Sequence, residues 1–221
     1  MSITDNLLKI KGSLPKNVTL VAVSKTHPIE AVAEAYAAGQ RIFGESRPQE
    51  MRDKYASLPK DIEWHMIGHL QTNKVKYIAP FVSLVHSIDS QRLLECINNE
   101  AAKNSRVIDI LLEIHVAEEI SKTGWDIAEL RAYLEDGSWR ELKNVRIRGV
   151  MSIATNTDDE SRVRGDFERL MEYHAQLAEY FDENFNIVSM GMSDDYELAI
   201  ACGSTMVRIG SKIFGERDYS K

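Results

Sequence analysis

Eight strongly apolar runs recur along the chain, and they limit the choice of fold more than any other feature of the sequence. Most are continuously apolar, which is typical of strands covered on both faces, as in a parallel sheet. The runs are 18–24, 41–44, 62–68, 81–88, 107–116, 145–153, 186–192 and 206–215. Amphipathic helical patterns separate several of them. The alternation of strand and helix therefore predicts a parallel α/β fold.

Three of the intervening segments show helical periodicity clearly. The first lies between Pro28, which suits a first helical turn, and Gly39, which suits the position after a last turn. Its apolar stripe is Ile29, Val32, Ala33 and Tyr36. A second helix is predicted after Ser90, a residue suited to the N-cap, and the third and longest stripe covers 163–181. We expect each stripe to pack against the sheet.

Eight parallel strands joined by crossover helices predict a (β/α)8 TIM barrel, and 221 residues is near the lower end for that fold. An open, doubly wound sheet is the alternative. The sequence contains no linker rich in Pro, Gly or Ser, so we predict a single domain over residues 1–221. The last run, 206–215, lies close to the end of the chain. We therefore expect no full helix after it, with a helix over 3–11 covering part of that gap.

Composition excludes several classes of function. The formal net charge is −7, whereas nucleic-acid-binding proteins are usually basic or carry a basic stripe. No apolar run approaches the ~18 residues that a membrane helix needs. The first 14 residues contain no apolar segment of the kind found in signal peptides. We therefore expect a cytoplasmic protein with neither a nucleic-acid partner nor a membrane partner.

A lysine directly follows the end of the first apolar run. Active sites of (β/α)8 barrels form at the carboxyl ends of the strands, so Lys25 is expected at the mouth of the barrel. Partial desolvation favours the neutral amine, which is a nucleophile toward aldehydes and ketones. The alternative is a structural lysine that pairs with a carboxylate such as Glu45 or extends into water. Position alone leaves both interpretations open.

Glycines and hydroxyl side chains gather around the last two predicted strands, where such barrels often bind phosphate. They are Ser193, Gly203, Ser204, Thr205, Gly210 and Ser211. Alternatively, Gly203 ends a helix and Gly210 lies in a turn or strand. Arg208 is either a phosphate ligand or an ion-pair partner within the strand. Together with Lys25, this cluster describes a site for an aldehyde that carries a phosphate.

The sequence offers little support for other chemistry. His65 and His69 could bind a metal only with a third ligand, which no cluster of His, Cys or Asp clearly supplies, so we predict no metal site. His27, His86 and His115 are expected to be hydrogen-bonded packing residues. No nucleophile elbow, phosphate-binding P-loop or dinucleotide-binding glycine motif is present.

Five segments in the same order resemble the family of pyridoxal phosphate (PLP) homeostasis proteins over nearly the whole chain. They are LVAVSKTHP (20–28), FGESRPQE (43–50), WHMIGHLQTNK (64–74), RGVMSI (148–153) and MGMSDDYELAIACGSTMVRIGSKIFGER (190–217). The resemblance implies a barrel like the N-terminal domain of alanine racemase, with PLP as the cofactor. It also implies an internal aldimine on Lys25, with the phosphate held by Ser193, Gly210 and Ser211.

The resemblance to alanine racemase further implies that Arg208 faces the pyridine nitrogen. Arginine keeps its proton and cannot accept a hydrogen bond, so the ring nitrogen would stay unprotonated and would be a weaker electron sink. Ser46, His69 and Met151 are also predicted near the cofactor. Many family members have asparagine at the position of Ser46, so the role of this serine is open.

The resemblance implies a protein of vitamin B6 balance that holds PLP and passes it on. In alanine racemase the second catalytic base is a tyrosine from a separate β-domain. The chain ends six residues after its last apolar run, so we expect that domain to be absent. We therefore predict a monomer without a catalytic residue, with PLP-requiring apo-enzymes as its partners. The alternatives are a PLP-dependent amino-acid racemase and a Schiff-base aldolase acting on a phosphorylated sugar.

Overall fold

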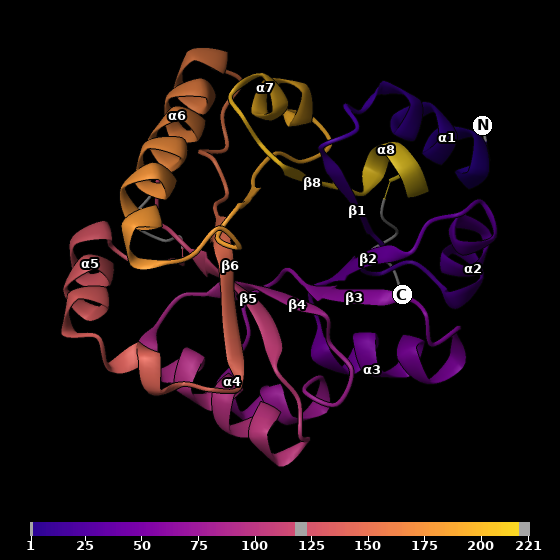
Figure 1. Ribbon diagram of the computed structural model, residues 1–221. Helices are drawn as coiled ribbons and strands as arrows, with labels where there is room; N and C mark the ends of the chain where they lie inside the picture. Colours follow the sequence, from indigo (N-terminus) through magenta and orange to yellow (C-terminus); the bar gives the residue numbers. More distant parts are fainter. Residues whose placement is uncertain (1, 118–122, 217–221) are drawn as a thin grey trace.

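The computed structural model describes residues 2–117 and 123–216, and these form a closed barrel of eight parallel strands (Figure 1). The strands follow one another around the barrel in chain order, and β1 pairs with both β2 and β8. This closure confirms the predicted (β/α)8 barrel. An open sheet, which would leave β1 or β8 at an edge, is wrong for this chain.

Seven strands lie within predicted runs, and β2 extends one residue beyond its run of 41–44, to Glu45. The strands are β1 (Thr19–Val23), β2 (Ile42–Glu45), β3 (Glu63–Met66), β4 (Leu84–Ile88), β5 (Ile108–Glu113), β6 (Val145–Met151), β7 (Ile187–Ser189) and β8 (Met206–Ile209). The last run was expected to be strand to residue 215. Instead β8 ends at Ile209, because Gly210 takes a helical ψ of −75° and begins the short helix α8 (Ser211–Phe214).

Helices surround the barrel as a ring (Figure 1). They are α1 (Ile3–Ser13), α2 (Ile29–Ala37), α3 (Pro48–Ser57), α4 (Gln91–Lys103), α5 (Ile127–Asp136), α6 (Glu160–Leu177) and α7 (Tyr196–Ala201), with the 3-10 helices η1 (Thr72–Tyr77), η2 (Ser138–Glu141) and η3 (Ala178–Tyr180). The predicted N-terminal helix packs beside α8, where Asn6 Nδ2 donates to the carbonyl of Ile213 at 3.2 Å. Helices α1 and α8 thus jointly cover the junction of β8 and β1.

The predicted helix faces match the buried faces with small differences. The Ser90 hydroxyl caps α4, and Leu93, Leu94, Ile97 and Ala101 are all buried. In α2, Val32 is buried but Ala33 is exposed, and Ala35 is buried instead. A helix of 3.6 residues per turn brings either alanine near the edge of the stripe, and packing against the sheet decides between them. In α6 the buried apolar face ends at Leu177, and Ala178 is exposed.

Alternate residues of the strands fill the inside of the barrel, as the period of two in a strand requires. One buried cluster, formed by strand residues alone, lies there: Val21, Leu84, Leu111, Met151 and Met206. Two residues farther along their strands, His86 and Arg208 occupy inward-facing positions and are also buried. The interior is therefore apolar at its base and polar toward the carboxyl mouth. Within the described ranges, no helix is long and apolar enough to cross a membrane.

Candidate functional site

A cavity of about 520 Å³ lies at the carboxyl mouth of the barrel. This volume is within the range of about 300–1,000 Å³ typical of small-molecule sites. Its lining includes five of the eight residues that were predicted to bind a cofactor: Lys25, Ser193, Arg208, Gly210 and Ser211. The structure therefore brings together a primary amine, two hydroxyls, a guanidinium and a glycine. They come from the turn after β1, the loop after β7, and β8 with the two residues that follow it.

Lys25 reaches this cavity because of its place in the alternation of β1. Val21 and Val23 point into the barrel, so the residue two positions farther along points into its mouth. Lys25 is half-buried and lies in the turn that follows the strand. Its side chain thus starts from a fixed strand end and lines a cavity large enough for a small molecule.

Ser193 and Gly210 form the part of the lining that suits a phosphate. The Gly210 amide donates to Ser193 Oγ at 3.2 Å, which joins the loop after β7 to the loop after β8. A Cβ on Gly210 would lie 3.1 Å from the carbonyl oxygen of Val23, so a side chain there would press on β1. Ser211 begins α8, and the first amides of a helix have no acceptor within the helix. Hydroxyls and such amides around one point favour an oxyanion.

The other predicted hydroxyls lie at the opposite end of the barrel. Ser204 and Thr205 precede β8, at its amino end. Ser204 Oγ donates to the carbonyl of Met190 at 2.8 Å, and the Val188 amide donates to Thr205 Oγ1 at 2.9 Å. Gly203 has a φ of +105° just after α7, so it ends that helix. These residues stabilise the connection between β7 and β8, and the idea that they line the cavity is wrong.

Arg208 is almost fully buried, and its guanidinium is fixed by the backbone around it. Nη1 donates to the carbonyl of Ser189 at 2.9 Å and to its hydroxyl at 2.7 Å, and Nη2 donates to the carbonyl of Ser152 at 2.9 Å. Burial lowers the pKa of Arg208 to about 10, which still leaves it charged at neutral pH. The cavity therefore contains a rigid cation that can donate hydrogen bonds but cannot accept them.

Two buried histidines continue the contacts of Arg208 across the barrel. His86 Nδ1 lies 3.1 Å from Ser189 Oγ, and His86 Nε2 lies 3.0 Å from His65 Nδ1. Each of these two contacts joins one donor and one acceptor, and the tautomers of the two rings set which atom donates. Burial lowers the pKa of His65 to about 3 and that of His86 well below its ordinary value. Both rings are therefore neutral packing residues, as was predicted for His86.

Because His65 and His86 are buried as neutral rings, we predict that the folded protein loses stability in acid. The pKa of His65 is about 3 in the folded protein and 6.5 in an exposed chain, so below pH 6.5 only the unfolded state takes up the proton. The free energy of unfolding should therefore fall as pH falls from 6.5 toward 3, by about 1 kcal/mol per pH unit for each histidine. Urea unfolding at pH 7, 6 and 5 measures this slope. We expect His65→Gln to flatten it and the exposed control His69→Gln to leave it unchanged, and equal slopes in all three proteins would contradict the assignment.

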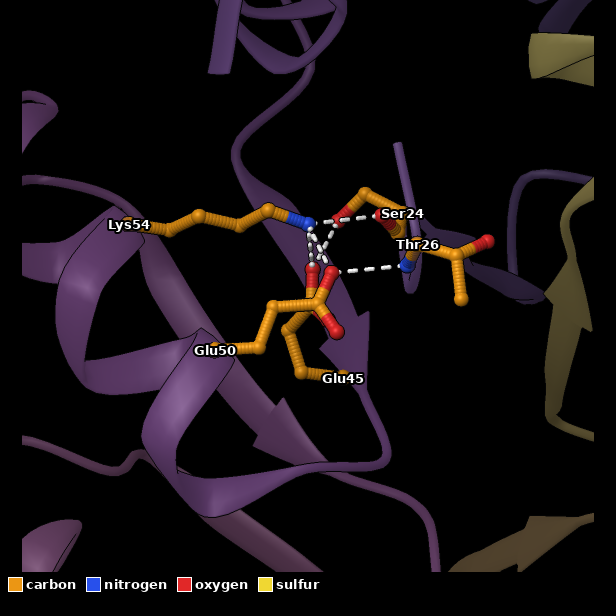
Figure 2. A network of polar contacts seen from close by, with 5 residues as sticks. All are labelled: Ser24, Thr26, Glu45, Glu50 and Lys54. Carbon is orange, nitrogen blue, oxygen red and sulfur yellow. Dashed lines mark hydrogen bonds and ion pairs between the residues drawn. The ribbon is translucent and has the colours of Figure 1, made fainter. Parts of the chain in front are cut away.

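A second buried polar network lies on the outer side of β1 and β2, facing α3 (Figure 2). Lys54 Nζ lies 2.7 Å from Glu45 Oε1 and 2.7 Å from Glu50 Oε1. Ser24 Oγ donates to Glu45 Oε1 at 2.6 Å. Burial raises the pKa of Glu45 to about 7 despite the opposing charge of Lys54. A carboxyl group and an ammonium group are thus held together in the layer between sheet and helix.

This network settles the placement of Glu45, which was considered as a structural partner of Lys25. Glu45 shares the orientation of Phe43, which packs in the main core between strands and helices. Its carboxylate therefore points away from the inside of the barrel, and Lys54 is its ion-pair partner. The side chains of Lys25 and Glu45 therefore lie on opposite faces of the sheet.

The remaining predicted residues do not line this cavity. Ser46 and His69 line a separate cavity of about 260 Å³, and His69 Nδ1 lies 3.2 Å from Asp89 Oδ2. Met151 is buried inside the barrel. Contact of these three residues with a cofactor stays a prediction. Over residues 2–117 and 123–216, no group of three or more His, Cys, Asp or Glu side chains is arranged to hold a metal ion.

Sequence reasoning missed several buried polar residues around the site. Glu113 is the last residue of β5 but lies inside an apolar run, and Glu45, which was considered only as a partner of Lys25, directly follows one. Burial also raises the pKa of Glu113, whose carboxylate accepts from Thr123 Oγ1 at 2.7 Å. Glu50 and Lys54 are four residues apart on one helix, a spacing that favours an ion pair. These signals were present but carried no information about which face each residue would serve.

Comparison with known proteins identifies relatives along almost the whole chain. The family model described as the alanine racemase N-terminal domain matches residues 1–218. The pyridoxal phosphate homeostasis protein of Aquifex aeolicus (strain VF5) is 42% identical over 201 residues, covering 90% of this chain and 87% of the relative. That of Escherichia coli (strain K12) is 40% identical over 220 residues, covering 95% and 90%.

Solved structures agree with this similarity. PipY of Synechococcus elongatus PCC7942, solved with PLP bound, has a TM-score of 0.88 and 38% identity, covering 97% of this chain and 100% of that chain. The alanine racemase of Bartonella henselae with covalently bound pyridoxal phosphate has a TM-score of 0.72 at 17% identity, covering 99% of this chain and 60% of that one. At that identity the racemase shares the fold.

Proposed function

The chain belongs to the family of pyridoxal phosphate homeostasis proteins, and on this premise we propose that it binds PLP at the carboxyl mouth of the barrel, holds it covalently on Lys25 and releases it again. The observation that carries the proposal is the gathering of Lys25, Ser193, Arg208, Gly210 and Ser211 around one cavity. The PLP bound in the PipY structure supports the choice of ligand.

The residues present match the chemistry of the ligand. PLP supplies an aldehyde, which condenses with primary amines, together with a phosphate and a pyridine ring. Lys25 is the amine in the lining, and Ser193, Ser211 and the amide-rich start of α8 suit the phosphate. A Cβ on Gly210 would lie 3.1 Å from the Val23 carbonyl oxygen, so glycine lets the residues after β8 lie close to β1.

The proposed link to Lys25 is reversible without any other reagent. The neutral ε-amine adds to the aldehyde carbon, a carbon–nitrogen double bond forms, and the carbonyl oxygen leaves as water. Adding water back breaks the bond and restores both the lysine and the aldehyde. Lys25 therefore suits a protein that stores PLP and gives it up, because neither direction needs an oxidant or a reductant.

The surroundings of the cavity support retention over turnover. Arg208 is a fixed donor, and opposite a pyridine nitrogen it would keep that nitrogen unprotonated and so weaken the electron sink needed for carbanion chemistry. Racemisation at Cα also needs an acid–base group on each face of the cofactor. Besides Lys25, the described lining offers the carboxyl groups of Asp194 and Glu216 but no tyrosine, cysteine or histidine. We further propose that the protein is a single domain over residues 1–221, that it is monomeric and cytoplasmic, and that it supplies PLP to PLP-requiring apo-enzymes.

Transfer of PLP tests this function. We expect PLP-loaded protein to restore the activity of a PLP-requiring apo-enzyme, because hydrolysis frees the ligand intact. The rate of reactivation should be compared with spontaneous release, measured by trapping free PLP with excess semicarbazide. In parallel, a panel of amino acids in deuterated water reports exchange at Cα. No reactivation, or Cα exchange that depends on Lys25, would contradict a carrier role, and the latter result would favour the racemase alternative.

A further inference from the structure

Side chains of α3 form hydrogen bonds with the backbone of the turn immediately before and after Lys25. The Ser24 carbonyl accepts from Lys54 Nζ at 2.7 Å, and the Thr26 amide donates to Glu50 Oε1 at 2.7 Å (Figure 2). Lys25 lies between these two backbone contacts, and its side chain lines the cavity. Two neighbouring side chains of α3 thus fix the backbone immediately before and after it.

Thr26 has a backbone conformation that needs such support. Its φ is +69°, which lies in the left-handed region. For a β-branched residue this conformation is strained, and it persists only where the surroundings hold it. Thr26 Oγ1 is buried and has no hydrogen-bond partner in the described part of the chain. The turn is supported through backbone groups: the Thr26 amide donates to Glu50 Oε1, and the His27 amide donates to the Ser24 carbonyl at 3.1 Å.

Glu50 is itself fixed by its neighbours. Its Oε1 accepts from Lys54 one helical turn later on α3, and Lys54 also contacts Glu45 at the end of β2. Ser24 closes the network by donating its hydroxyl to Glu45. The turn after β1, the end of β2 and the first two turns of α3 are therefore joined by buried and part-buried charge-assisted hydrogen bonds, which are stronger than neutral ones.

We propose that Glu50 is a positioning residue for Lys25. By accepting the Thr26 amide, it holds the turn in its left-handed conformation and so fixes the point from which the lysine amine enters the cavity. Lys54 fixes the position of Glu50, and Glu45 fixes the position of Ser24, through the hydrogen bonds described above. This inference rests on the proposed function, since it concerns the amine that is proposed to bind PLP.

The test separates covalent capture from binding. Wild-type protein, Glu50→Ala, Glu50→Gln and the control Asp53→Asn are mixed with PLP, and borohydride-reduced adduct on the Lys25 peptide is measured over time by mass spectrometry. Asp53 is an exposed carboxylate on the same helix that pairs with Arg52. Affinity for pyridoxine 5′-phosphate, which has the phosphate but no aldehyde, reports binding without capture.

We expect Glu50→Ala to slow adduct formation about tenfold, the scale of one lost hydrogen bond to a charged group. Glu50→Gln keeps an acceptor oxygen and should remain within about threefold of wild type. Affinity for pyridoxine 5′-phosphate should be equal in all four proteins. The Thr26 amide should exchange with solvent deuterium faster in Glu50→Ala than in Glu50→Gln or the control, and this readout needs no PLP.

Four results would overturn the inference, and the first three are measured with ligand. One is adduct formation at the wild-type rate in Glu50→Ala. Another is an equally slow Glu50→Gln, because it would assign the effect to charge and not to the Thr26 contact. The third is a parallel loss of pyridoxine 5′-phosphate affinity, which would indicate general damage to the cavity. Absence of the adduct in wild type would instead refute the proposed function, while unchanged exchange at Thr26 would refute the positioning role on its own.

Discussion

Replacing Lys25 with alanine is expected to abolish covalent retention of PLP. In the structure Lys25 is the lysine in the described lining of the cavity, and its side chain enters from the end of β1. Without the amine, only the proposed non-covalent contacts of Ser193, Arg208 and the start of α8 would remain. We expect the Kd for PLP to rise about a hundredfold or more, which corresponds to ~2.7 kcal/mol.

The absorbance spectrum of PLP-loaded, dialysed protein measures this loss. Wild type should keep a cofactor band and Lys25→Ala should have none. The control Lys103→Ala removes an exposed lysine of α4 that pairs with Glu100, and it should behave as wild type. Affinity for pyridoxine 5′-phosphate should survive in Lys25→Ala, because the substitution leaves the proposed phosphate-binding residues Ser193, Gly210 and Ser211 intact. A retained band after dialysis of Lys25→Ala would contradict the proposal.

Replacing Lys54 with methionine is expected to cause the largest loss of stability. Lys54 is 4% exposed, and Glu45 beside it is fully buried. Removing one member of a buried ion pair leaves an uncompensated group, which typically costs about 3–5 kcal/mol. Since Glu45 already has a pKa raised to about 7, loss of the ammonium should favour its protonated form further. Urea unfolding at pH 7 measures the change in the free energy of unfolding.

A second substitution distinguishes an unpaired charge from a simple packing defect. In the Lys54→Met background, Glu45→Gln removes the carboxylate that was left without a partner, so it should recover part of the lost stability. The exposed pair of Lys103 and Glu100 gives the control, where Lys103→Met should cost less than about 1 kcal/mol. A double variant less stable than Lys54→Met would show that charge burial is not the cause.

The barrel could be predicted because each of its strands leaves a signal in its own short stretch of sequence. Parallel strands covered on both faces need continuous apolar runs, and those runs appear eight times with helices between them. The ends of the strands were less predictable. The run that contains β8 was expected to be strand to residue 215, yet the chain turns at Gly210 into α8, whose Ile213 is buried.

The cavity was partly predictable because a charged residue at the end of an apolar run is informative. That argument brought attention to Lys25, and Arg208 within the last run is similar. It could not separate the two ends of a short strand. Ser204 and Ser211 flank the four residues of β8 closely in sequence, but they lie at opposite ends of the barrel, and only Ser211 lines the cavity.

The network of Ser24, Glu45, Glu50 and Lys54 could not be predicted, because it depends on the face of the sheet or helix on which each side chain lies. Glu45 and Lys25 both follow apolar runs, yet one points outward to α3 and the other into the mouth. The i, i+4 spacing of Glu50 and Lys54 is typical of an exposed helix pair, and here that pair is mostly buried. The contact of Glu50 with the Thr26 amide requires the closed arrangement of β1, β2 and α3.

Locating the bound cofactor on the chain tests the central claim most directly. PLP-loaded wild-type protein is reduced with borohydride, digested and analysed by mass spectrometry, so that the modified lysine is identified by its peptide. We predict one modified site, Lys25, in the segment that follows β1. Modification of a different lysine, such as Lys54 or Lys212, with Lys25 unmodified would contradict the account, as would a loaded protein that carries no covalent adduct.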